Sequence, residues 1–322
     1  MIPRKYPLLL SAGFCVLLLS CRETRNDQPI PDWKIAYNVL EDSASDNYEI
    51  YVMGKDGSGK TNISCSPDIS WVYYAWKDKL YFLSDRDTCE RCFFLYEMDA
   101  AGMGVRKVTD LQMEDSWMGS RLNGKEMVVS GRTNDGLRYQ LFLIDIGTGD
   151  FQQLTHDTAA MHRDPVFTPD GHHIVFVYRK NRDNPNQHEE LWIMESDGKH
   201  PRQLTFYPSR DTSASRQAYH TGPPRWNPVE RYFSYPSRQQ GKYSIFAVSP
   251  DGKQRFKVTE CSKDCTWHDW SPDGRWLALD MADTERTGYD IYLMDWETGV
   301  LKQLTDSAKP EYAPVFVEAP GK

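Results

Sequence analysis

The sequence contains no stripe of positive charge and no apolar run long enough to span a bilayer comfortably. Its 38 Lys and Arg residues are outnumbered by 46 Asp and Glu residues, and the resulting formal net charge of −8 is spread along the chain. The lack of a basic patch argues against nucleic acid as a partner. Helical periodicity and helix-capping signals are also missing from the body of the chain, which we therefore expect to consist of strands.

Two common signatures of catalysis are missing as well. No Gly-x-Ser-x-Gly sequence occurs, so a serine nucleophile elbow has no support. A Cys-x-x-Cys redox centre normally opens a helix in a βαβ unit, and no such unit surrounds Cys89-Glu-Arg-Cys92. The chain nevertheless has the composition of a folded protein, because 13% of its residues are aromatic.

The first 21 residues have the organisation of a secretory signal. A basic start precedes a short apolar run, residues 8–19, and Cys21 follows directly after Ser20. This ending resembles the bacterial lipobox, in which the signal is cleaved before the cysteine and the thiol is lipidated. The alternative is an ordinary signal peptide with an incidental cysteine. We predict lipidation of Cys21 and a flexible tether over residues 22–32.

The residue after the lipidated cysteine influences where such a protein is retained. An Asp there holds many Gram-negative lipoproteins at the inner membrane, whereas this chain has Arg22. The resemblance therefore implies an outer-membrane lipoprotein that is anchored through Cys21, on the periplasmic or the surface face.

Export places the remaining cysteines in an oxidising compartment. Cys89 and Cys92 form one close pair, Cys261 and Cys265 form another, and Cys65 is left over. We expect two local disulfides. A zinc site would need both pairs as its four ligands, but the pairs fall in different repeat units and at different places within the unit.

The body of the chain is a repeated unit. A Leu-Thr dipeptide or a close variant ends each copy, at intervals of about 45 to 54 residues. The six endings are Ile63-Ser64, Val108-Thr109, Leu154-Thr155, Leu204-Thr205, Val258-Thr259 and Leu304-Thr305. Before each ending, an alternating apolar segment leads into a turn that is usually glycine-containing, as in DIYLMDWETG, and this pattern predicts a hairpin. An apolar strand and an aromatic strand with its turn come earlier, so each unit holds four short strands.

Four antiparallel strands repeated six times predict an all-β, six-bladed β-propeller over residues 33–318. One sheet alone leaves both faces uncovered, whereas a radial stack buries each blade between two neighbours. The first unit lacks its aromatic strand, and residues 309–316 match the missing piece. We therefore predict that the C-terminal strand pairs with the N-terminal blade and closes the ring. An open solenoid would not need this split unit.

Two units resemble the TolB-like β-propeller repeat most clearly. They read WSPDGRWLALD…DIYLMDWETG…QLT and FTPDGHHIVFV…ELWIMESDG…QLT. The resemblance extends from Trp33 to about Val317 and implies the fold, which by itself does not determine function. TolB carries an α/β domain before its propeller, while the expectation here is a lipoprotein in which only the tether precedes the first blade.

Residues that recur from unit to unit are interpreted as structural. Asp170 and Asp273 in the Pro-Asp-Gly turns are expected to bond their own backbone. Bulky rings at one shared position are expected to pack between blades, and they would form a stacking platform for sugars only if they faced the axis. These rings are Trp76, Phe167, Trp226, Trp270 and Phe316.

Polar residues that do not recur lie where one blade leads into the next, and these loops gather at one mouth of the axial channel. The candidate ligand-binding residues are His162, Arg163, Asp164, Arg216, Tyr219, His220, Trp267, His268, Asp269, Glu311 and Tyr312. Asp115 and Trp117 hold the corresponding place at the start of the third blade. The insertion 207–221 is the segment that we most expect to contact a ligand, because functional loops are often long.

His162, His220 and His268 come from consecutive blades, and three histidines can bind a metal ion. Metal-dependent pectate-fragment lyases with related propellers use a histidine cluster, although the three histidines here do not occupy equivalent positions in their units. A divalent metal site is therefore one alternative. A polar binding mouth without metal and ordinary solvated loops are the others.

The expected function is a non-enzymatic binding scaffold for a protein or a peptidoglycan-associated partner in the bacterial envelope. The chain would be a monomer that is attached to the membrane through Cys21 and uses no cofactor. One alternative is a carbohydrate-active enzyme, such as a metal-dependent oligosaccharide lyase. Another is a glycan-sensing or transport accessory protein.

Overall fold

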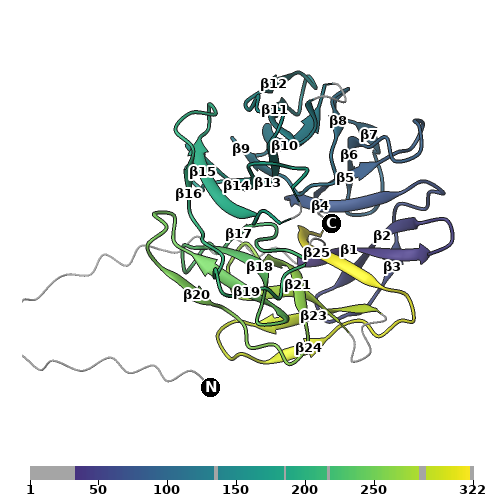
Figure 1. Cartoon of the computed structure of the whole chain (residues 1–322). Helices are drawn as coiled ribbons and strands as arrows, with labels where there is room; N and C mark the ends of the chain where they lie inside the picture. Colours follow the sequence, from purple (N-terminus) through teal and green to yellow (C-terminus); the bar gives the residue numbers. More distant parts are fainter. Residues whose placement is uncertain (1–32, 134–136, 185, 216–217, 283–287, 320–322) are drawn as a thin grey trace, which may run out of the picture. The chain divides into compact units, whose positions relative to one another are not determined.

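The computed structural model describes residues 33–133, 137–184, 186–215, 218–282 and 288–319. The predicted signal, Cys21 and the tether lie outside these residues. The regular elements of the described chain are strands, which form six antiparallel sheets in a ring around one axis (Figure 1). The predicted six-bladed, all-β propeller is confirmed. Within the described residues, no helix has the length and apolar character needed to cross a membrane.

The first three blades take up the first half of the chain and receive one strand from its end. The first blade consists of β25 (Glu311–Glu318), β1 (Trp33–Asp42), β2 (Asn47–Gly54) and β3 (Thr61–Asn62), from the axis outward. The second consists of β4 (Ser70–Trp76), β5 (Lys79–Ser84), β6 (Phe94–Asp99) and β7 (Arg106–Lys107). The third consists of β8 (Gln112–Met113), β9 (Gly119–Arg121), β10 (Glu126–Arg132), β11 (Gln140–Asp145) and β12 (Phe151–Gln153).

The other three blades follow in the same order from the axis outward. The fourth consists of β13 (Met161–Phe167), β14 (His173–Arg179), β15 (Glu190–Glu195) and β16 (Arg202–Gln203). The fifth consists of β17 (Arg225–Trp226), β18 (Phe233–Gln239), β19 (Lys242–Val248) and β20 (Arg255–Lys257). The sixth consists of β21 (Cys265–Trp270), β22 (Trp276–Ala282), β23 (Tyr289–Asp295) and β24 (Leu301–Gln303).

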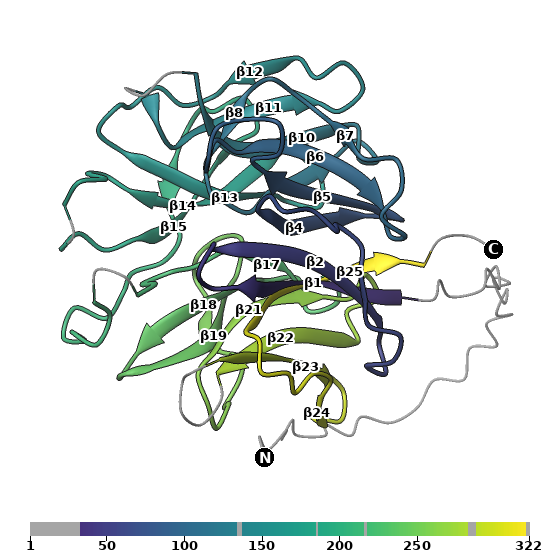
Figure 2. The ribbon, with the colours of Figure 1, turned by 90° about the vertical axis from the view of Figure 1, so that its right-hand side faces the viewer.

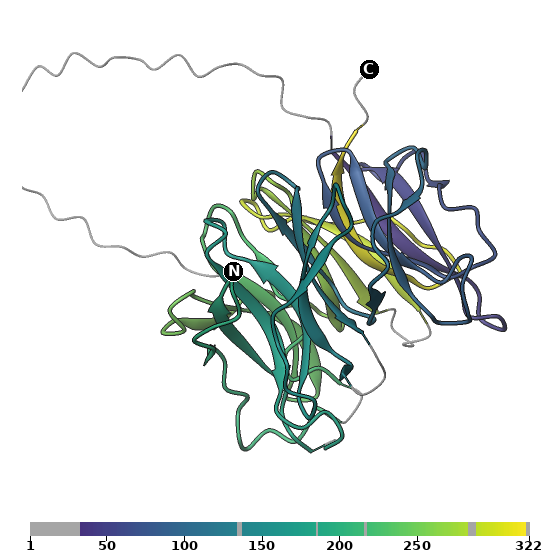
Figure 3. The ribbon, with the colours of Figure 1, turned by 90° about the horizontal axis from the view of Figure 1, so that it is seen from above.

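The last strand closes the ring. β25 pairs antiparallel with β1, from Trp33 opposite Glu318 to Val39 opposite Glu311. The yellow C-terminal strand therefore lies beside the purple first strand (Figure 2) and also contacts β4 of the second blade (Figure 3). The predicted completion of the first blade by the end of the chain is confirmed.

The recurring Leu-Thr ending fastens the outer strand of each blade to the strand before it. In five blades the hydroxyl of the final residue accepts a hydrogen bond from a backbone N–H of the third strand, as Thr155 does from Leu141 at 2.9 Å. In the second blade, Thr109 instead donates its hydroxyl to the carbonyl of Gly149 in the third blade at 2.7 Å. The hydroxyl thus satisfies a backbone group where the outer strand ends, which explains why Thr or Ser recurs there.

The Pro-Asp-Gly turns are stabilised by their own Asp side chains. Asp273 accepts hydrogen bonds from the Ser271 hydroxyl at 2.5 Å and from the Arg275 N–H at 3.0 Å. Gly274 follows with a φ of 67°, a conformation that glycine adopts without steric cost. Asp170 is bonded in the same way. Both carboxylates are therefore turn residues, as their repetition predicts.

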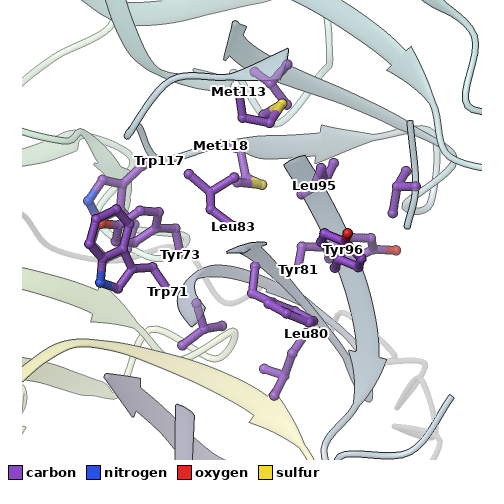
Figure 4. Packing of buried hydrophobic residues seen from close by; sticks show 14 of the residues in the cluster. Trp71, Tyr73, Leu80, Tyr81, Leu83, Leu95, Tyr96, Met113, Trp117 and Met118 are labelled. Carbon is purple, nitrogen blue, oxygen red and sulfur yellow. The ribbon is translucent and has the colours of Figure 1, made fainter. Parts of the chain in front are cut away.

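Apolar side chains fill the interfaces between blades. In the largest cluster, Leu83 and Leu95 of the second blade pack beside Met113 and Met118 of the third (Figure 4). The recurring rings take part in this packing: Phe167, Trp270 and Phe316 are buried, and the other two are partly buried. Four of these rings also line a cavity of about 270 Å³ near the axis: Trp76, Trp226, Trp270 and Phe316.

The cysteines behave differently in the two predicted pairs. Cys89 and Cys92 form a disulfide. Cys261 and Cys265 are buried free thiols, so the second predicted disulfide is not formed in this structure. The two thiols are held by hydrogen bonds instead: the Cys265 sulfur lies 3.4 Å from the Thr259 hydroxyl and 3.9 Å from the Tyr243 carbonyl. A hydrogen bond with Cys265 lowers the pKa of Cys261.

Ring closure predicts a large energetic effect at the C-terminal strand. Phe316→Ala should lower the free energy of unfolding by about 3–5 kcal/mol, because the ring is buried in the interface between the first and sixth blades. Phe206→Ala is the matched control, since 61% of Phe206 is exposed, and its cost should stay below about 0.5 kcal/mol. Chemical denaturation measures both, and equal effects would show that closure does not depend on this packing.

Candidate functional site

A pocket of about 330 Å³ opens at one end of the axis and receives residues from all six blades. Five of the predicted site residues line it: Arg163, Asp164, Tyr219, Trp267 and Tyr312. Asp115 and Trp117, predicted at the start of the third blade, line it as well. The remaining lining residues are Asn38, Asp46, Tyr48, Trp71, Tyr73, Arg91, Ser116 and Ala313.

β-Bulges on the inner strands shape this pocket. The register of β13 with β14 shifts between Arg163 and Val166, and Asp164 in the bulge has a φ of 52°. A corresponding shift lies between β25 and β1, and Ala313 there has a φ of 54°. A bulge inserts an extra residue and redirects the side chains around it. At Arg163 and Asp164, two consecutive side chains can therefore both reach the pocket.

In the third blade the inner strand is broken altogether. The segment between β8 and β9 contains Asp115, Ser116 and Trp117, and the fourth blade supplies two of its hydrogen bonds. The Trp117 N–H donates to the Asp164 carboxylate at 2.9 Å, and the Asp164 N–H donates to the Ser116 hydroxyl at 2.7 Å. Asp164 thus holds a pocket-lining segment of the neighbouring blade in place.

Arg225 closes the axis below the pocket. Its guanidinium lies 3.8 Å from the centre of the Trp117 ring and donates to the Tyr73 carbonyl at 2.9 Å. It also lies 3.6 Å from Asp269 on the other side, where both residues line the 270 Å³ cavity. The channel is therefore divided into two cavities, and the predicted site residue Asp269 belongs to the second one.

Two carboxylates in the first pocket are poorly compensated. Asp115 is exposed within the pocket and accepts a hydrogen bond from the Tyr73 hydroxyl at 2.8 Å. Desolvation raises its pKa. Asp164 is buried, and desolvation raises its pKa to about 6 although Arg163 acts in the opposite direction. Arg163 itself donates to Glu189 at 2.7 Å and lies 4.9 Å from the centre of the Tyr219 ring.

The disulfide loop contributes to the pocket. Arg91 lies between Cys89 and Cys92 and donates its backbone N–H to Asp85 at 2.8 Å. Its side chain pairs with Asp46 and lies 5.4 Å from the centre of the Trp71 ring. The disulfide therefore presents a cation at the pocket, a role that the cysteine spacing alone did not indicate.

The three histidines of the alternative metal site do not come together in the structure. The His162 Nδ1 lies 3.2 Å from the Tyr139 carbonyl, and His220 stacks on His188 with ring centres 4.5 Å apart. The His268 Nε2 lies 2.7 Å from the Ser234 hydroxyl. Each imidazole has its own surroundings, away from the pocket lining. Among the described residues, no group of three His, Cys, Asp or Glu side chains is placed to hold a metal ion.

The other predicted residues are dispersed. Glu311 is buried in β25 and does not line the pocket, and Arg216 lies outside the described residues. Of the long insertion 207–221, Tyr219 is the described residue that reaches the pocket, while Arg210 belongs to a separate surface groove. The length of this insertion was therefore a poor guide to ligand contact.

Several pocket residues were not predicted. Trp71 and Tyr73 lie on β4, the inner strand of the second blade, and the preference for aromatic residues on inner strands could have indicated them. Asn38, Tyr48 and the loop residue Asp46 come from β1, β2 and the turn between them. No sequence signal places residues of the second strand, the third strand or the turn between them at the axis.

The fold is shared with TolB structures. The crystal structure of TolB from Acinetobacter baumannii matches with a TM-score of 0.66 and 17% identity, over 88% of this chain and 66% of that one. A putative TolB from Agrobacterium tumefaciens matches with a TM-score of 0.58 and 16% identity, over 91% and 100% of the chains. An oligogalacturonate lyase from Vibrio parahaemolyticus matches with a TM-score of 0.52 and 15% identity, over 81% and 72%.

The chain is thus a TolB-like six-bladed propeller in fold. It spans just under two thirds of the length of the Acinetobacter TolB chain. No protein-family model matches the sequence, and no curated protein matches it significantly. At these identities the similarity shows the shared architecture, and function has to be argued from the pocket.

The buried histidines predict a loss of stability in acid. Burial lowers the pKa of His268 to about 3 and that of His162 to about 4, against 6.5 when unfolded. Below pH 6.5 the unfolded chain gains protons that the folded chain does not, so stability is full above pH 6.5 and declines toward pH 3. Buried carboxyl groups with raised pKa values, such as Asp164, act in the opposite direction.

A single variant isolates the histidine contribution. His268→Gln should show a smaller fall in melting temperature between pH 7 and pH 5 than the wild type, because it cannot take up a proton when it unfolds. His200→Gln removes an exposed imidazole and should keep the wild-type pH dependence. An unchanged pH dependence in His268→Gln would contradict this assignment.

Proposed function

We propose that this chain is an envelope lipoprotein whose propeller is a non-enzymatic binding scaffold, and that its partner inserts into the axial pocket. The observation that carries the proposal is a pocket built by all six blades that contains buried polar atoms without a hydrogen-bond partner. These atoms are Arg163 Nε, Asp164 Oδ2 and Trp267 Nε1. Arg163 Nε and Asp164 Oδ2 form an ion pair at 3.6 Å, but none of the three atoms has the hydrogen bond that buried polar atoms normally make, which favours a bound partner at this site.

The chemistry of the lining favours binding over turnover. The Ser116 hydroxyl donates to the Trp117 carbonyl at 3.0 Å and accepts from the Asp164 N–H, so it is not paired with a base. Arg163 is held by Glu189 and Arg91 by Asp46. These contacts hold the walls of the pocket rigid, which reduces the ordering cost of binding.

The proposed partner is a protein or a peptidoglycan-associated component of the envelope. A lipid on Cys21 and the tether of residues 22–32 would keep the propeller within reach of the membrane. Aromatic side chains are suited to such an interface, because they provide a large contact area and lose little conformational entropy.

Site-specific photo-crosslinking in the cell envelope tests the binding role. A photoreactive amino acid at Tyr219, inside the pocket, should yield a discrete crosslinked partner, whereas the same group at Phe256 on the outer strand β20 should not. Trp267→Ala should abolish the crosslink from position 219 without reducing the amount of protein. Equal crosslinking at both positions, or none at position 219, would contradict the proposal. Metal-dependent cleavage of an oligosaccharide by the purified chain would replace it with the lyase function.

Cell fractionation tests the anchor separately. The full chain should sediment with membranes and incorporate a labelled fatty acid, and Cys21→Ala should do neither, because the lipid is attached to that thiol. Cys65→Ala is the matched control, since Cys65 is a free and exposed thiol of the propeller. If Cys21→Ala still sedimented with membranes and the full chain incorporated no labelled fatty acid, lipid anchoring at this residue would be ruled out.

A further inference from the structure

Aromatic rings form a belt around the axial pocket. The centres of successive rings lie 5.0 to 6.4 Å apart along the series Trp117, Tyr73, Trp71, Tyr48, Tyr312, Trp267 and Tyr219. The first three of these rings are grouped together in Figure 4. The two ends of the series meet the fourth blade, where Arg163 lies against the Tyr219 ring and Asp164 bonds the backbone of Trp117. All six blades therefore contribute to one closed wall.

Negative charge exceeds positive charge around this belt. Among the residues that line the pocket, three carboxyl groups face two guanidinium groups: Asp46, Asp115 and Asp164 against Arg91 and Arg163. Asp46 pairs with Arg91, while Arg163 lies 3.6 Å from Asp164 and 2.7 Å from Glu189, which is outside the pocket lining. Asp115 has the Tyr73 hydroxyl as its hydrogen-bond donor, and the buried Asp164 Oδ2 accepts no hydrogen bond. A positively charged guest would compensate the Asp115 carboxylate, which has a hydroxyl rather than a cation as its partner.

The belt already accommodates cations in this way. Arg91 lies 5.4 Å from the centre of the Trp71 ring, and Arg163 lies 4.9 Å from that of Tyr219. Both distances are within the range of about 6 Å at which a cation is attracted by an aromatic face. Both arginines are also paired with carboxylates, which reduces their repulsion of a further cation in the pocket.

We propose that the axial pocket binds an alkylammonium group, the side chain of a lysine on a polypeptide partner, between the aromatic belt and Asp115. The aliphatic stem would contact the rings, and the ammonium group would bond the exposed Asp115 carboxylate and approach Asp164. This proposal rests on the proposed binding function and specifies its chemistry. An anionic guest is disfavoured, because both carboxylates would repel it while the arginines are already paired.

Calorimetric titration with small probes tests this chemistry. Nα-acetyl-lysine methylamide should bind the full propeller, and Nα-acetyl-norleucine methylamide, which has the same stem without the ammonium group, should bind roughly tenfold or more weakly. Asp115→Asn keeps an acceptor for the Tyr73 hydroxyl but removes the charge, so it should weaken lysine binding by roughly tenfold to a hundredfold. Trp267→Ala should also weaken it, through loss of one ring of the belt.

Asp110→Asn is the matched control for charge, because Asp110 is 93% exposed and lies outside the pocket. It should leave lysine binding unchanged. Equal binding of the norleucine probe, equal effects of the two Asp substitutions, or no binding of the lysine probe would each overturn the proposal. A partner crosslinked at Tyr219 alongside such a result would show that the binding function holds with a different chemistry.

Discussion

The antiparallel pairing of β25 with β1 is the interaction on which the rest of the structure depends. A four-stranded blade is stable only when both of its faces are covered, and a propeller covers them only when its first and last blades meet. Here one blade is assembled from both ends of the described chain. Phe316 from the end and Ile35 from the beginning are buried together with Ile291 and Leu293 of the sixth blade. Without this pairing, the first blade would lack its inner edge and the sixth blade one of its neighbours.

Polar side chains on second strands join neighbouring blades at two places and thereby shape the pocket. Asn38 bonds both the N–H of Val72, at 2.8 Å, and its carbonyl, at 3.1 Å, so an amide matches both groups. Asp280 accepts hydrogen bonds from the N–H of Ala313 at 3.0 Å and from that of Trp267 at 2.9 Å. Both groups are donors, so a carboxylate, which only accepts, matches them. Burial raises the pKa of Asp280 to about 7. These contacts hold the bulged inner strands whose side chains line the axis.

The errors in the predicted site follow from the alternation of side chains along a strand. Successive side chains point to opposite faces, so neighbouring residues cannot all reach one cavity. Trp267 lines the pocket while His268 is buried beside Ser234, and Tyr312 lines it while Glu311 does not. Arg163 and Asp164 both line it because Asp164 lies in the bulge, and Tyr312 and Ala313 both line it at the corresponding bulge of β25. The three histidines were grouped because they lie at similar places in consecutive blades. Their side chains point in different directions, however, and this keeps them apart.

The sequence by itself determined the features that repeat. The Leu-Thr endings, the Pro-Asp-Gly turns and the split first unit depend on hydrogen bonds between residues close in the chain or on matching copies, and such signals are visible in one dimension. Only the tertiary structure decided which side chains surround the pocket. Asp46 and Arg91 lie on different blades, and Asp115 and Trp267 are far apart in the sequence. All four line one pocket because ring closure brings six inner strands to one axis. Bulges, a disulfide loop and a broken strand then set the direction of each side chain, and none of these has a fixed place in the repeat.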